Sequence, residues 1–139
     1  MSDPYGPPPT PPPSGQPGAL TQEDRTWALA SHVGTLVSAW FAFGFLAPLL
    51  VMLIKSDSPF VRRHAVESLN FQISLLIYSV VGAIVAVVLT FATLGIGLFV
   101  IIPLVAVLAL VVLVLIIVAT VKAGNGEDYR YPLTLRFIS

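Results

Sequence analysis

The sequence predicts an all-α integral membrane protein: a small helical bundle of three spans, or of four helical segments, behind a disordered proline-rich N-terminal tail. Apolar residues make up 56% of the 139 residues and charged residues only 10%, whereas an ordinary soluble domain carries about 25% charged residues. Three apolar stretches, at about residues 27–54, 66–91 and 98–121, are each long enough to cross a hydrocarbon core of roughly 30 Å.

Residues 1–20 form the first predicted unit. They hold eight of the twelve prolines, together with glycine and serine. Such a segment buries too little apolar surface to offset its ordering entropy, so we expect a disordered tail with polyproline II character. It acts either as a solvated tether, the reading we favour, or as a ligand for a proline-recognising partner. Residues 21–138 form the second unit, the transmembrane domain.

The first apolar segment carries a start signal and an interruption. Thr21 and Asp24 have the spacing of a capping box at a helix N-terminus. Gly44 and Pro48 interrupt the uncharged stretch 26–54, because the ring of Pro48 would clash with the carbonyl of Gly44 in a continuous helix. Two arrangements fit: a single kinked span, or a broken helical hairpin that enters and returns on the same side.

The other two apolar segments are separated by a turn. Ser58 is a good N-cap and Pro59 suits the first position of the following helix. Residues 68–121 contain no charge and are numerous enough for two spans. We place the turn between them at 93–97, Thr-Leu-Gly-Ile-Gly.

Basic residues predict the orientation. The 93–97 turn has none, and they gather in the 55–65 connection and after the last span: Lys55, Arg62, Arg63, Lys122, Arg130 and Arg136. The positive-inside rule therefore places the 55–65 connection and the C-terminus in the cytoplasm. The side of the N-terminus stays open, since it depends on whether residues 27–54 span once or form a hairpin.

One helix face carries the candidate polar interface. Residues 63, 67, 70, 74 and 78 are spaced four, three, four and four apart, so they share a face. Polar side chains at such depth point toward protein or a water-filled cavity. The face is either a groove for a substrate, lipid headgroup or partner helix, or a structural face in which Glu67 pairs with Arg63 and the others bond neighbouring helices. The candidate residues are Arg63, His64, Glu67, Asn70, Gln72, Ser74 and Tyr78.

Catalytic and metal chemistry find little support. The chain has no cysteine, and His32 and His64 lack metal-ligand spacing with each other or with a carboxylate. No nucleophile elbow or phosphate loop occurs, so we expect no enzyme, metal or cofactor. A net charge of zero gives no reason to expect nucleic acid as a partner. The expected partners are the lipid bilayer and either another membrane protein or a second copy of the chain. Small residues recur at four-residue spacing at Gly82, Ala86 and Thr90, and this spacing allows another helix to approach closely.

Four sequence blocks carry a resemblance to a known family. They are His32-Val33-Gly34, Ala47-Pro48-Leu49-Leu50, Arg63-His64-Ala65-Val66-Glu67-Ser68-Leu69-Asn70-Phe71-Gln72 and residues 125–138. Together they resemble a bacterial family of small Tic-twenty-like membrane proteins, similar to a component of the chloroplast inner-envelope import machinery. The resemblance covers residues 21–138 and implies a compact helical membrane bundle in a bacterial plasma (inner) membrane. It also implies an association with protein translocation, in which the plastid protein is a channel-forming or scaffolding subunit.

The resemblance also implies a role for the C-terminal segment. Its candidate interfacial residues are Tyr129, Arg130, Tyr131 and Arg136. The two arginines could face lipid phosphates or the Glu67 region, or they could simply anchor the end of the bundle. The predicted function is a non-enzymatic interaction or translocation-associated subunit. The alternative is a small solute or ion channel, formed by oligomers and lined by the 63–78 face.

Overall fold

Four helices, followed by a non-helical C-terminal segment, make up the described part of the chain. The computed structural model describes residues 19–39, 44–55 and 57–139, and no strand occurs in these ranges. The elements are α1 (Gln22–Ala39), α2 (Leu46–Ile54), α3 (Pro59–Ala92) and α4 (Leu98–Gly124). The all-α class is confirmed for the described part of the chain. The predicted disordered tail falls almost entirely on residues 1–18, outside the described residues.

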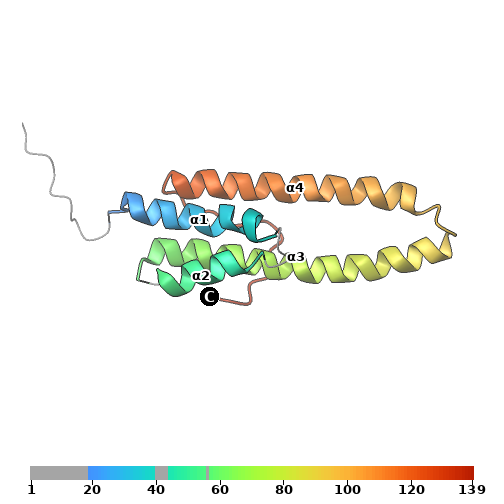
Figure 1. The fold of residues 1–139 in the computed structure, drawn as a ribbon, viewed down its shortest axis with the longest axis horizontal. Helices are drawn as coiled ribbons and strands as arrows, with labels where there is room; N and C mark the ends of the chain where they lie inside the picture. Colours follow the sequence, from blue (N-terminus) through green and yellow to red (C-terminus); the bar gives the residue numbers. More distant parts are fainter. Residues whose placement is uncertain (1–18, 40–43, 56) are drawn as a thin grey trace, which may run out of the picture.

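Helices α1 and α2 form a hairpin that returns to the end where it began (Figure 1). The predicted capping box opens α1: the N–H of Asp24 donates to the hydroxyl of Thr21, and the N–H of Thr21 donates to the Asp24 carboxylate, both at 3.0 Å. Lys55, just beyond α2, forms an ion pair with Glu23 in the first turn of α1. Of the two arrangements left open for residues 27–54, the structure therefore has the broken hairpin.

The expectation of a third span is not confirmed. Helix α2 has nine residues, or about 14 Å, which is too short for a core of about 30 Å, and α1 opens with the charged residues Glu23, Asp24 and Arg25. Pro48 explains the break, because it lies in the first turn of α2, where an amide N–H has no intrahelical partner to lose. Pro48 thus lies in the first turn of a separate helix and does not kink a continuous one.

Within the described ranges, α3 and α4 are the two helices long and apolar enough to cross a membrane. The side chain of Ser58 caps the start of α3 and Pro59 follows it. The turn at residues 93–97 connects α3 to α4, with positive φ values at Leu94 (51°) and Gly95 (88°). The predicted cap and turn are both confirmed.

The packed core lies at only one end of the molecule, which we call the head (α1, α2 and residues 57–75 and 115–139). Three buried clusters join its elements, among them Ala28 of α1 with Phe60 of α3 and Ala123 of α4. Beyond the head, no side chain between residues 76 and 115 is buried. There α3 and α4 run apart from each other until the turn that joins them, and they touch each other little (Figure 1). Two apolar helices therefore project from a packed head that contains most of the polar side chains.

We expect Gly34→Ala to destabilise the head by about 1–3 kcal/mol, because an added Cβ would lie 2.7 Å from the Cβ of Ala47 at the α1–α2 contact. Unfolding in detergent, followed by the fluorescence of Trp27, measures the change. Gly82→Ala is the matched control, since a Cβ there meets nothing within 4 Å. Equal effects of the two substitutions would contradict the close approach of α1 and α2.

Candidate functional site

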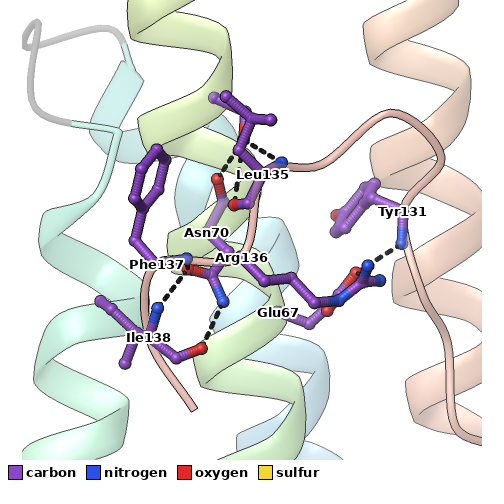
Figure 2. Close-up of polar contacts among 8 residues, drawn as sticks. Glu67, Asn70, Tyr131, Leu135, Arg136, Phe137 and Ile138 are labelled. Atoms are coloured by element: carbon purple, nitrogen blue, oxygen red, sulfur yellow. Dashed lines mark hydrogen bonds and ion pairs between the residues drawn. The ribbon is translucent and has the colours of Figure 1, made fainter.

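The polar face of α3 (residues 63, 67, 70, 74 and 78) contacts the C-terminal segment of the same chain, residues 129–139. We call this C-terminal segment the tail from here on, as distinct from the proline-rich N-terminal segment. Figure 2 shows Asn70 at the centre of this contact. Its Oδ1 accepts hydrogen bonds from the N–H groups of Phe137 and Ile138, both at 2.9 Å. Its Nδ2 donates to the carbonyl oxygen of Ile138 at 2.8 Å. One buried amide thus satisfies three main-chain groups of an extended segment.

Two further side chains of α3 continue the contact. The hydroxyl of Ser74 accepts from the N–H of Leu135 at 2.8 Å. The hydroxyl of Tyr78 donates to the carbonyl oxygen of Leu133 at 2.8 Å. The tail therefore binds α3 through its main chain, while the α3 side chains supply the complementary groups.

The register of this contact follows from the geometry of the two elements. Partners on α3 step by four residues (70, 74, 78), and partners on the tail step by two in the opposite direction (137, 135, 133). Four helical residues rise about 6 Å and two extended residues advance about 6.6 Å, so the two periods nearly coincide. The segment 135–138 can therefore lie antiparallel along one helix face, whereas Leu133 lies in a turn, with a positive φ of 57°, that brings its carbonyl oxygen to Tyr78.

This contact gives a physical reason for the polar side chains of an otherwise apolar helix. Asn70, Ser74 and Tyr78 lie in the stretch of α3 that carries no charge. Non-helical main chain at membrane depth requires hydrogen-bond partners from protein, because lipid supplies none. If this stretch of α3 enters the bilayer, the three side chains satisfy main-chain groups of the tail that lipid would leave unpaired, and the tail satisfies them in return.

Glu67 binds the tail at another point along α3, closer to the start of the helix. Its Oε1 accepts from the N–H of Tyr131 at 2.8 Å and from the guanidinium of Arg136 at 3.3 Å (Figure 2). Arg63 pairs with Asp128 instead, at 3.1 Å. The expected Arg63–Glu67 pair is therefore wrong, because the tail occupies the Glu67 carboxylate and residue 128 lies within reach of Arg63.

Behind the tail, a buried hydrogen-bonded chain links Tyr131, His32 and His64. The Tyr131 hydroxyl lies 3.0 Å from Nδ1 of His32, and Nε2 of His32 lies 2.9 Å from Nδ1 of His64. The ring of Tyr131 also stacks on Phe71, with centroids 3.8 Å apart. The tail, α1 and α3 therefore meet at Tyr131.

In this hydrogen-bonded series, His32 and Tyr131 are both uncharged. Burial, and to a smaller extent the neighbouring His64, lowers the pKa of His32 to about 3. Burial raises the pKa of the Tyr131 hydroxyl far above its usual range, so the hydroxyl keeps its proton. One ring nitrogen of the neutral His32 donates and the other accepts, so either tautomer completes the hydrogen bonds to Tyr131 and His64. The arrangement stabilises the fold without placing a charge in the core.

The remaining candidate residues have separate positions. His64 belongs to the buried chain behind the tail, and Gln72 is half-buried without a hydrogen bond to the tail. Tyr129 packs edge-on against Tyr131, with centroids 5.1 Å apart. Arg130 is exposed. The structure thus brings together Glu67, Asn70, Ser74, Tyr78, Tyr131 and Arg136, and leaves Gln72 apart.

Sequence reasoning missed the contact between His32 and His64 and the identity of the segment that covers the polar face. The two histidines are far apart in sequence and share no spacing rule. The tail is recognised through main-chain groups, which carry no residue signature. The alternating apolar residues Leu133, Leu135 and Phe137 were the one available indication of an extended segment.

A pocket of about 460 Å³ opens at the charged end of α3, between the start of this helix and the tail. Arginine side chains and two carboxylates line it, with apolar side chains on one side. Among the described residues, no three histidine, aspartate or glutamate side chains gather in a way that could hold a metal ion. The lining of the pocket is suited to binding a ligand and holding it in position.

Comparison with known proteins places this architecture in a family. A family model described as the magnetosome magnetite crystal formation protein family matches residues 23–138, from the first turn of α1 almost to the end of the tail. The chain belongs to this family. No curated protein and no solved structure was found to match the chain.

Membership in the magnetosome magnetite crystal formation family corrects the Tic-twenty-like resemblance, which is wrong. Two of the four blocks that carried it, residues 63–72 and 125–138, contain the two sides of the contact between α3 and the tail. Such blocks report how the head is held together, and a shared way of folding does not specify an activity. The family and the two exposed apolar helices together indicate a membrane protein, and they are consistent with a non-enzymatic role.

Proposed function

We propose that the chain is a non-enzymatic, multi-pass protein of a bacterial membrane that acts in magnetite crystal formation through contacts made by its head. The observation that carries this proposal is the tail on the polar face of α3. Glu67, Asn70, Ser74 and Tyr78 all bond the tail. The polar groups of that face therefore stabilise the fold. The proposed function then depends on surfaces of the head that contact other molecules.

The channel alternative loses its main support for the same reason. It requires the 63–78 face to line an aqueous path between copies of the chain. The side chains that would contact permeating ions instead bond the tail main chain, and Asn70 is buried. We therefore favour an interaction protein over a pore.

The topology that fits this proposal places the head in the cytoplasm. The α1–α2 hairpin, the 55–65 connection and the end of α4 share one end of the molecule, and the 93–97 turn lies at the other (Figure 1). The shared end carries the basic residues, which the positive-inside rule assigns to the cytoplasm. In this orientation α3 and α4 are the two spans, and the N-terminus is cytoplasmic.

Complementation in a magnetosome-forming bacterium tests the proposal. The host lacks its own members of the family and expresses this chain, the tail-releasing variant Asn70→Leu, or the control Gln72→Leu. We expect the native chain and the control to restore crystal number and size in electron micrographs, and Asn70→Leu to fail, because its head cannot hold the tail.

A second measurement addresses the pore. Purified chain is reconstituted in planar bilayers, where we expect no conductance from the native chain or from Asn70→Leu. Ion currents that change with Asn70→Leu would favour the channel. In the complementation experiment, crystals of the same number and size in every strain would contradict a role in crystal formation.

A further inference from the structure

The pocket at the charged end of α3 concentrates positive charge. Glu67 and Asp128 neutralise two of its guanidinium groups, through the pairs Arg136–Glu67 and Arg63–Asp128. Four guanidinium groups line the pocket in all: Arg62, Arg63, Arg130 and Arg136.

The other two guanidinium groups have no carboxylate side chain as partner. Arg62 donates to a main-chain oxygen of Ser139 at 2.8 Å. Arg130 forms no ion pair with any residue that the structure describes. Even with a carboxylate at Ser139, positive charge exceeds negative charge in the pocket. The pocket is therefore suited to an anion.

The position of the pocket specifies the kind of anion. It lies where the charged start of α3 gives way to the uncharged stretch that begins at Ser68, which is the level of the lipid headgroups if α3 spans the bilayer. Val66, Phe137 and Ile138 form an apolar part of its lining, and Phe137 is 58% exposed. A ligand with an anionic group and an apolar part matches both halves of this surface.

We propose that this pocket binds the phosphate group of an anionic phospholipid. Planar guanidinium groups match phosphate oxygens in paired hydrogen bonds, and basic pockets beside transmembrane helices are recurrent headgroup sites. A volume of about 460 Å³ accommodates a headgroup and leaves the acyl chains against the exposed surface of α3. The tail forms one wall of this site, which shares Glu67 and Asn70 with the tail contact, but the site does not depend on a role in crystal formation.

Native mass spectrometry of the purified full chain tests this site. The probes are phosphatidylglycerol, phosphatidylcholine and inorganic phosphate, each added to the protein in detergent. We expect phosphatidylglycerol to bind at least about tenfold more tightly than phosphatidylcholine, and the double variant Arg62→Gln, Arg130→Gln to lose roughly this preference. Arg25→Gln is the matched control, because Arg25 is a cation of the head that does not line the pocket.

Each outcome has a defined meaning. Loss of the preference in the double variant, with unchanged circular dichroism and an unaffected control, supports the site. Equal binding of the two lipids, or the same loss in Arg25→Gln, overturns it. Binding of inorganic phosphate that requires the same two arginines would overturn a lipid as the ligand. None of these results depends on the complementation experiment, so the two proposals can fail separately.

Discussion

Tyr131→Ala is expected to lower the free energy of unfolding of the head by about 4 kcal/mol, because it removes a large buried ring from the point where three elements meet. Tyr131 is only 2% exposed and stacks on Phe71, while Ile116 and Ala119 complete the same cluster. The cavity would open between α3, α4 and the tail. Unfolding in detergent, followed by the fluorescence of Trp27, measures the loss.

Tyr131→Phe separates the ring from its hydroxyl. The phenylalanine ring keeps the stack on Phe71, and only the hydrogen bond to Nδ1 of His32 disappears. We expect a smaller loss of about 1–2 kcal/mol, the usual cost of leaving one buried polar group unpaired. If alanine proved no worse than phenylalanine, the tail would not be anchored by this ring.

Local signals in the sequence predicted the element boundaries well. The Thr21–Asp24 box, the Ser58-Pro59 start and the 93–97 turn each depend on a few neighbouring residues, whose chemistry is the same in water and in lipid. The path of residues 27–54 depends instead on how α1 and α2 pack against α3. An apolar composition is compatible with a span and with a hairpin, so the sequence left both open.

The candidate site was predicted in part for a related reason. Helical spacing placed residues 67, 70, 74 and 78 on one face, since this periodicity is a property of a single helix. What covers that face is a long-range contact with main-chain groups of the tail, and neither its partner nor its register is written in residue types. The spacing predicted a polar surface without revealing that the chain fills it itself.

Asn70→Leu should release the tail from α3. It removes three hydrogen bonds, at 2.9, 2.9 and 2.8 Å, and leaves main-chain groups of Phe137 and Ile138 without partners against an apolar side chain. At about 1 kcal/mol for each bond the docked tail loses about 3 kcal/mol. We expect the amides of Leu135 and Phe137 to exchange with deuterium roughly 100-fold faster, which mass spectrometry of the tail peptide measures.

Gln72→Leu is the control for this change, because it replaces an amide by the same side chain two positions along the same helix. Gln72 has no hydrogen bond to the tail, so exchange in residues 133–138 should stay as in the native chain. Equal acceleration in both variants would mean that the substitution perturbs α3 itself. Acceleration in Asn70→Leu alone would show that one amide, placed where four helical residues match two extended ones, fixes the register of the tail.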